Sequence, residues 1–218
     1  MTVMSGQSVQ DATFDELVEW ARALAIPGQR RILGLTGAPG AGKSTVAADL
    51  VEALGTDLAV LAPMDGFHLA NEVLIDLGRL DRKGAHDTFD DDGYARLIEA
   101  VRGQGPDGPI VYAPRFRREI EESIGSAIPV LPSVPLVVTE GNYLLMEIDA
   151  WPRAHAQIDE VWFLAPDTDV RHHRLVQRHE AYGKTPEEAA FWALGSDERN
   201  AELITSTAVR ADRVLRLR

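Results

Sequence analysis

The stretch GAPGAGKST, residues 37–45, decides the fold of this chain. It fits the pattern G-x-x-x-x-G-K-[ST], in which glycines let backbone amides turn around phosphate groups and the lysine reaches the terminal phosphates. An apolar strand is expected before it, at 31–36, and a helix after it, at 42–54, which is the context that phosphate binding at a helix N-terminus requires. The stretch predicts a nucleotide site formed by Gly37, Ala38, Pro39, Gly40, Ala41, Gly42, Lys43, Ser44 and Thr45.

Short apolar segments alternate with helical segments along the rest of the chain. Strands are expected at residues 31–36, 58–63, 136–139, 161–164 and 214–217. Helices are expected at residues 13–26, 42–54, 69–77, 94–101, 167–180 and 186–194. Buried strands connected through helices indicate a parallel sheet covered on both faces, so the fold class is predicted to be a three-layer α/β/α protein.

Length and composition limit the remaining possibilities. A chain of 218 residues is expected to form a disordered leader at 1–12 and one domain at 13–218, with a mobile lid at about 167–195. It has no cysteine, and a net charge of −12 makes it a poor binder of nucleic acid or of an anionic membrane. No apolar run could cross a membrane, and the leader lacks a basic region, so the cytoplasm is the expected location. A homodimer is compatible with the sequence but is not required by it.

Two of the predicted strands end in a carboxylate. Asp65 follows the strand at 58–63, and Glu140 follows the strand at 136–139. Because the carboxyl ends of parallel strands meet at one edge of the sheet, both acids are expected beside the phosphate loop. Asp65 is the candidate general base, and Glu140 could bind magnesium together with the Ser44 hydroxyl. The alternatives are a helix cap for Asp65 and a solvent-facing side chain for Glu140.

The motif alone does not distinguish kinases from other phosphate-loop proteins. A GTPase should carry N-K-x-D to bind guanine, and the sequence contains no Asn-Lys pair. A motor ATPase usually ends a strand with two adjacent acids, whereas here a single acid, Glu140, is followed by Gly141. These differences favour a kinase.

Basic residues are concentrated in three places within this acidic chain. They are Arg79, Arg82 and Lys83, then Arg115, Arg117 and Arg118, and finally Arg171, Arg174 and Arg178. Spacings of three and four place the last group on one helical face, which could either close over a nucleotide or face solvent. The second group could instead pair with Glu119, Glu121 and Glu122.

Taken together, these segments resemble the P-loop kinases grouped with phosphoribulokinase, uridine kinase and type I pantothenate kinase. The chain is most similar to the branch of nucleoside/nucleotide kinase family proteins, some of which are labelled fructose-transport-system kinases. The resemblance covers residues 32–217. It rests on GAPGAGKST (37–45), PMDGFHLAN (63–71), LGRLDRKGAHDTFDDDGY (77–94), YAPRFRREI (112–120), TEGNYLL (139–145), RLVQRH (174–179) and SDERNAELI (196–204).

This resemblance implies a P-loop kinase core with a five-stranded parallel sheet and a small helical lid. It implies ATP and Mg²⁺ as cofactors, with Asp65 as catalytic base and Glu140 as the metal-binding acid. Lys43 and the lid residues Arg174 and Arg178 are then expected to stabilise the transferring phosphate. The predicted contacts with the acceptor are His68, Lys83, Arg118, Tyr143 and Asn200.

One departure from the family pattern bears on the acceptor. Close relatives usually read Phe-Asp-Arg where this chain has Phe116-Arg117-Arg118. The sequence predicts an ATP-dependent kinase that phosphorylates an alcohol of a small polyhydroxylated molecule, a nucleoside or a sugar. Two alternatives remain open: a pantothenate-kinase-like activity, and a regulatory P-loop NTPase that has no small-molecule acceptor.

Overall fold

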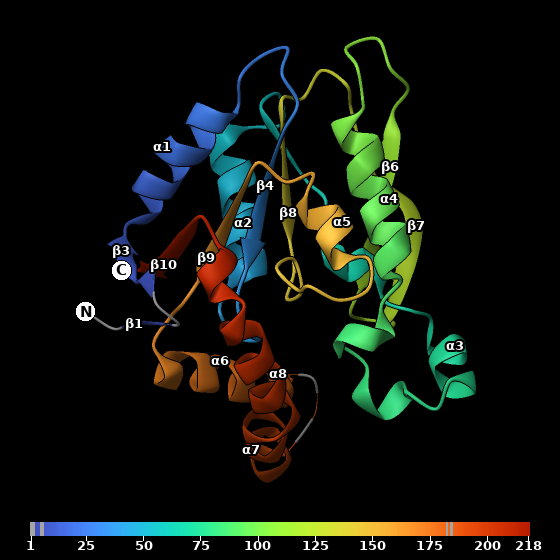
Figure 1. Ribbon diagram of the computed structural model, residues 1–218. Helices are drawn as coiled ribbons and strands as arrows, with labels where there is room; N and C mark the ends of the chain where they lie inside the picture. Colours follow the sequence, from blue (N-terminus) through green and yellow to red (C-terminus); the bar gives the residue numbers. More distant parts are fainter. Residues whose placement is uncertain (1–2, 5–6, 182, 184) are drawn as a thin grey trace.

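A parallel sheet of six strands lies at the centre of the computed structural model (Figure 1), which describes residues 3–4, 7–181, 183 and 185–218. In spatial order the strands are β3 (Gln10–Ala12), β10 (Arg213–Leu217), β9 (Glu160–Leu164), β4 (Arg31–Thr36), β8 (Leu136–Glu140) and β5 (Ala59–Leu61). All neighbouring pairs in this sheet are parallel. The predicted α/β fold class is therefore confirmed.

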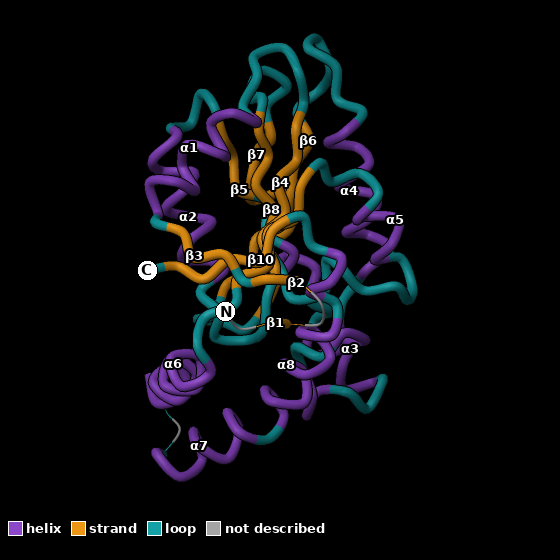
Figure 2. The backbone as a smooth tube through the Cα atoms, turned by 60° about the vertical axis from the view of Figure 1, so that its left-hand side comes forward, coloured by secondary structure: helices purple, strands orange, loops and turns teal. Residues whose placement is uncertain are grey.

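Helices cover the two faces of the sheet (Figures 1 and 2). One face carries α1 (Phe14–Leu24) and α2 (Lys43–Leu54), and the other carries α4 (Asp91–Arg102) and α5 (Trp151–His155). Side chains of β4 alternate between the two layers: Leu33 packs beneath α1 and α2, whereas Ile32 packs beneath α4 and α5. In the described residues no helix is both long enough and apolar enough to cross a membrane.

The edge strand β3 corrects the expectation of a disordered leader at 1–12 for its last three residues. Gln10–Ala12 forms the edge strand β3, paired with β10, so the sheet has six strands rather than the expected five. This polar strand is held by Asp11, which accepts hydrogen bonds from Arg216 Nε at 2.7 Å and from Arg218. Those two bonds lower the pKa of Asp11 to about 2. The short strands β1 (Val3–Met4) and β2 (Gln7–Ser8) precede it, and residues 1–2 and 5–6 lie outside the described part.

An antiparallel hairpin that the sequence did not predict lies beside the sheet. It consists of β6 (Val111–Arg117) and β7 (Glu122–Val130), with a shift of register between Ala113 and Arg115. The hairpin contacts the 3₁₀ turn η1 (Met64–Phe67), which directly follows β5. The expected long loop at 78–92 contains the turns η2 (Leu80–Arg82) and η3 (His86–Thr88), after the short helix α3 (Asn71–Asp76).

Three helices project from the carboxyl edge of the sheet, at the bottom of Figure 1. They are α6 (Thr168–Ala181), α7 (Pro186–Leu194) and α8 (Ser196–Ser206), followed by the turn η4 (Ala208–Arg210). Arg171 of α6 is only 6% exposed and forms an ion pair with Glu198 of α8. His172 lies 2.9 Å from the same carboxylate, so this contact ties α6 to α8.

Asp159, which directly precedes β9, is a hub at the opposite edge of the sheet. Its carboxylate accepts hydrogen bonds from Arg31 Nη1 and from the Ile32 amide, both at 2.7 Å, and from Arg102 of α4. Burial by itself would raise the pKa of Asp159, but the hydrogen bonds from Arg102, Ile32 and Arg31 outweigh it and hold the pKa below its usual range.

Replacing Asp159→Asn should lower the free energy of unfolding by about 1–3 kcal/mol, because one acceptor oxygen becomes an amide that faces a guanidinium. The depressed pKa means that the ionised side chain stabilises the fold above its unfolded-state pKa and loses this effect as the pH falls through the folded-state value. Urea unfolding at neutral and acidic pH measures both effects. Asp57→Asn, at an exposed position, is the control. Equal stability of the two variants would show that the hydrogen bonds of Asp159 do not stabilise the fold.

Candidate active site

Two adjoining cavities open at the carboxyl edge of the sheet. The larger, of about 710 Å³, lies between the phosphate loop and α6, and the smaller, of about 280 Å³, lies between the phosphate loop, η1 and the β6–β7 hairpin. Ser44 and Arg118 line both cavities. A molecule in one cavity would therefore meet a molecule in the other near these two side chains.

The phosphate loop connects β4 to α2 in the predicted way. Lys43 is 8% exposed, and its Nζ donates to the carbonyls of Gly37 at 2.8 Å and Ala38 at 3.2 Å. Gly40 has a φ of 80°, and a Cβ there would lie 2.8 Å from the carbonyl oxygen of Arg171. A glycine is required at this position because the loop turns through the left-handed region directly beneath α6.

Glu140 lies at the end of β8, against the start of α2. It is 4% exposed, and its Oε1 accepts a hydrogen bond from Ser44 Oγ at 3.1 Å. Burial raises the pKa of Glu140 to about 7 and lowers the pKa of Lys43 to about 8. Two buried groups of opposite charge at the same edge of the sheet are typical of a site that receives charged ligands.

Asp65 lies in the turn η1, immediately after β5. Its Oδ2 accepts a hydrogen bond from Arg118 Nη2 at 3.1 Å, and its backbone carbonyl accepts one from His68 Nδ1 at 2.7 Å. Gly66 allows the hairpin to pack here, since a Cβ at this residue would lie 2.5 Å from the carbonyl oxygen of Pro114. The hairpin thereby fixes the turn that carries Asp65.

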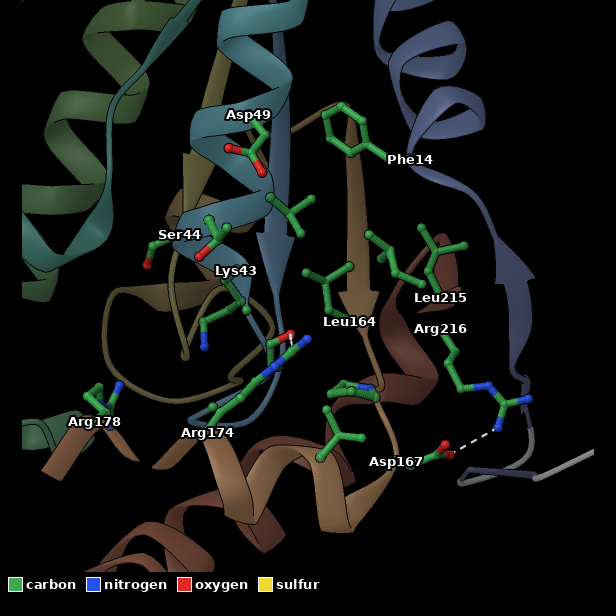
Figure 3. A pocket seen from close by; sticks show the side chains of 18 of the residues that line it. Phe14, Lys43, Ser44, Asp49, Leu164, Asp167, Arg174, Arg178, Leu215 and Arg216 are labelled. Atoms are coloured by element: carbon green, nitrogen blue, oxygen red, sulfur yellow. Dashed lines mark hydrogen bonds and ion pairs between the residues drawn. The ribbon is translucent and has the colours of Figure 1, made fainter. Parts of the chain in front are cut away.

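The larger cavity has an apolar wall and a cationic end (Figure 3). The wall consists of Phe14, Val46, Leu164, Pro166, Val170, Leu215 and Leu217. Lys43, Arg174 and Arg178 provide the cationic end, and Arg174 Nη1 lies 3.4 Å from the Ala41 carbonyl oxygen in the phosphate loop. This combination suits a molecule with an apolar ring at one end and anionic groups at the other.

The smaller cavity is lined by residues of both charges around an aromatic ring. The residues are Ser44, Leu61, Pro63, Asp65, Arg115, Phe116, Arg118, Ile128 and Glu140. The Phe116 ring stacks on His68 with 4.5 Å between centroids. Lys83 Nζ and the Arg118 guanidinium lie 5.4 and 5.8 Å from the centroid of the same ring.

The structure brings together most of the residues that the sequence singled out. Lys43, Ser44, Thr45, Asp65, Arg118, Glu140, Arg174 and Arg178 line one or both cavities, and His68 borders the smaller one. Of the arginine face expected on α6, Arg171 is instead buried against Glu198. Only Arg174 and Arg178 of that group line the larger cavity.

Three of the residues predicted to contact the acceptor do not line the smaller cavity in this structure. Tyr143 is fully buried and donates from Oη to the Gly84 carbonyl at 2.5 Å. Lys83 Nζ donates to Asn71 Oδ1 at 2.6 Å and to the Glu121 carbonyl at 2.5 Å. Asn200 lies on α8 and lines neither of these two cavities. Contact of these three residues with an acceptor remains a prediction.

Sequence reasoning missed two parts of the site. The apolar wall of the larger cavity includes Phe14 and Leu217, which come from opposite ends of the chain, and no sequence pattern connects them. Arg115 belongs to the basic group for which pairing with nearby glutamates was one open alternative; it lines the smaller cavity, and no ion pair in the described residues joins it to a glutamate. The Glu122 carboxylate instead accepts a hydrogen bond from the Asn71 amide at 2.9 Å.

Known proteins with the same arrangement of elements are P-loop kinases. A candidate uridine kinase of Schizosaccharomyces pombe is 33% identical over 217 residues, which is 94% of this chain and 90% of the relative. A crystal structure of a candidate fructose transport system kinase from Silicibacter sp. TM1040 superposes with a TM-score of 0.83 at 36% identity, over 93% of this chain and 98% of that one. The kinase YFH7 from Saccharomyces cerevisiae, at 16% identity and a TM-score of 0.81, shares the fold. No protein family model matches the chain.

The close packing of Gly66 on the hairpin can be tested by adding one methyl group. Gly66→Ala should lower the free energy of unfolding by about 1–3 kcal/mol, because the new Cβ overlaps the Pro114 carbonyl and the turn must move. Gly125→Ala in β7 is the matched control, since its Cβ would meet no atom within 4 Å. Thermal and urea unfolding compare the two variants. If they are equally stable, the turn is not held by the hairpin.

Proposed function

Because this chain belongs to the P-loop kinases that include uridine kinase and pantothenate kinase, we propose that it transfers the γ-phosphate of ATP to an alcohol of a small polyhydroxylated molecule, a nucleoside or a sugar. Its relatives support the more general part of this function, that of an ATP-dependent small-molecule kinase. The observation that carries the more specific proposal is the junction of the two cavities, where Ser44 and Arg118 line both and Arg118 donates a hydrogen bond to Asp65.

The larger cavity suits ATP. Its apolar wall can receive the base, and the loop residues Gly40–Ser44 can surround the phosphates with backbone amides at the N-terminus of α2. Lys43 would reach the β- and γ-phosphates, and Arg174 and Arg178 would contact them from α6. Cations at this position stabilise charge that develops on the transferred group.

Ser44 and Glu140 fit a magnesium ion. Their side-chain oxygens are 3.1 Å apart and adjoin the phosphate loop, and the buried Glu140 carboxylate lacks the hydration that would stabilise its charge. Mg²⁺ commonly takes one or two protein oxygens and completes its coordination with water and phosphate. When bound, the ion would neutralise part of the charge on the phosphates.

Asp65 is the proposed base that acts on the acceptor. The Arg118 guanidinium holds one carboxylate oxygen, which fixes the side chain and leaves the other oxygen for the acceptor hydroxyl. In the proposed step this carboxylate takes the hydroxyl proton while the acceptor oxygen bonds to the γ-phosphorus. The bond from that phosphorus to the β–γ bridging oxygen breaks, and ADP leaves with the electron pair.

Release of ADP, measured with and without a panel of nucleosides, sugars and pantothenate, tests the proposal. A kinase is stimulated by an acceptor that fits the smaller cavity, and the phosphorylated product can be identified by mass spectrometry. Slow ADP release that is indifferent to every acceptor would favour the regulatory NTPase instead.

Lys43→Ala should nearly abolish phosphoryl transfer, because the ammonium is the charge aimed at the β- and γ-phosphates. The melting temperature should change little, since removing a buried charge offsets the two lost hydrogen bonds. Steady-state rates and a thermal melt check both expectations, with the exposed Arg96→Ala on α4 as the control. Retention of more than about a tenth of kcat, where a tenfold change is about 1.4 kcal/mol of barrier, would refute the role of Lys43.

Asp65→Asn should lower kcat by about 10²- to 10⁴-fold with a much smaller effect on the KM for ATP, because the amide cannot take a proton. Asp76→Asn, on the exposed side of α3, should leave both parameters unchanged. Steady-state kinetics with the best acceptor of the panel provide the comparison. If the variant binds ATP weakly but turns over normally, Asp65 is a nucleotide or metal contact and Glu140 becomes the better candidate for the base.

A further inference from the structure

We propose that Glu198 is a positioning residue for phosphoryl transfer: by pairing with Arg171 it holds α6 on the phosphate loop, with the two cavity-lining arginines of α6 toward the transferring phosphate. This inference rests on the proposed kinase function and adds to it a residue that lines neither of the two cavities. It is drawn from the burial and charge of Arg171 and from the packing of α6 on Gly40.

The Arg171 guanidinium is buried, and among the described residues Glu198 is the only carboxylate that forms an ion pair with it. Its Nη2 donates to the Glu198 carboxylate, whereas its Nη1 has no hydrogen-bond partner in that part of the chain. Burial by itself would raise the pKa of Glu198, but the hydrogen bonds from Arg171 and His172 outweigh it and hold the pKa below its usual range. Because an unpaired charge is costly to bury, Arg171 depends on Glu198 to stay inside.

The residue that pairs with α8 also forms the contact between α6 and the phosphate loop. A Cβ added at Gly40 would lie 2.8 Å from the carbonyl oxygen of Arg171 and 2.8 Å from Cγ of Leu175. Leu175, one helical turn further along α6, is fully buried. There is no free space between the helix and the loop at this point, so a displacement of Arg171 toward solvent would shift α6 on the loop.

The two cavity-lining arginines depend on the same placement of α6. Arg174 and Arg178 follow Arg171 at spacings of three and four residues, so the three side chains share one side of the helix. Figure 3 shows Arg174 extending from α6 toward the phosphate loop below Lys43, and its Nη1 lies 3.4 Å from the Ala41 carbonyl oxygen. Since such cations act only where the charge develops, a small rotation of α6 would weaken their effect on the transferred group.

Glu198→Gln should lower kcat by about 10-fold and change the KM for ATP by less than about threefold, because the arginines would act mainly on the transition state. Steady-state kinetics with the best acceptor of the panel measure both parameters. Glu202→Gln is the matched control: it removes the same charge from an exposed position of the same helix, so its kinetics should be unchanged.

Arg171→Met separates positioning from stability. It breaks the same ion pair but leaves no buried charge, and a well-packed apolar side chain in place of a buried ion often leaves stability unchanged or higher. The Glu198 side chain, 33% exposed, can then be solvated. We expect a melting temperature at or above that of the unmodified protein together with a kcat lowered by about 10-fold. A brace that only stabilised the lid would not produce a stable but slow variant.

A double-mutant cycle tests whether Glu198 acts through the arginines. Replacing Arg174 and Arg178 together by alanine should lower kcat by about 100-fold or more. In that background Glu198→Gln should lower kcat by less than about twofold further, because the groups that it positions are absent. The same cycle with Arg171→Met should give the same result, and it serves if Glu198→Gln melts below the assay temperature.

An unchanged kcat in Glu198→Gln or in Arg171→Met would overturn the inference and leave the kinase function in place. A full 10-fold effect of either change in the background without the two arginines would overturn it in the same way, since the tie to α8 would then act by another route. ADP release by the unmodified protein that no acceptor stimulates would instead overturn the proposed function, and this inference with it.

Discussion

The buried ammonium of Lys43 and the buried carboxylate of Glu140 impose the main physical constraint on this structure. Removing a charge from water costs several kcal/mol, and the opposite charge restores only part of it. The shifts in pKa of both groups have this origin. Charged ligands would stabilise such a pair, and in the proposed function these are phosphates and a divalent cation. Lys43, two glycines of the phosphate loop and the α6 residues Arg174 and Arg178 line the same cavity.

The order of the strands brings the other candidate functional residues to the same edge of the sheet. Neighbouring strands β4, β8 and β5 end in the phosphate loop, in Glu140 and in the turn that carries Asp65. Residues about 100 positions apart in the sequence therefore meet at the carboxyl edge of the sheet. The β6–β7 hairpin then closes one side of the smaller cavity, because Pro114 packs on Gly66 and Arg118 donates a hydrogen bond to Asp65. In the proposed function, recognition of the acceptor would depend on this hairpin more than on the sheet.

The sequence predicted the parts of the site that follow from local patterns. Apolar runs predicted five of the six strands, all except β3, and the spacing of the glycines and Lys43 predicted the phosphate loop. The hairpin was missed because a proline and two arginines obscure the alternation of β6 and because its pairing with β7 is non-local. The strand β3 was missed because its three residues are mostly polar and are held by ion pairs with the other end of the chain. Helical spacing also could not show that Arg171 turns toward α8, since this depends on Glu198.

The most direct test of the central claim, that one site joins nucleotide and acceptor, is the stoichiometry of a single reaction mixture. ADP, inorganic phosphate and phosphorylated acceptor would be quantified together as the acceptor concentration is raised. The account predicts that ADP and phosphorylated acceptor accumulate in equal amounts, with little inorganic phosphate. ADP that is matched by inorganic phosphate at every acceptor concentration would contradict it.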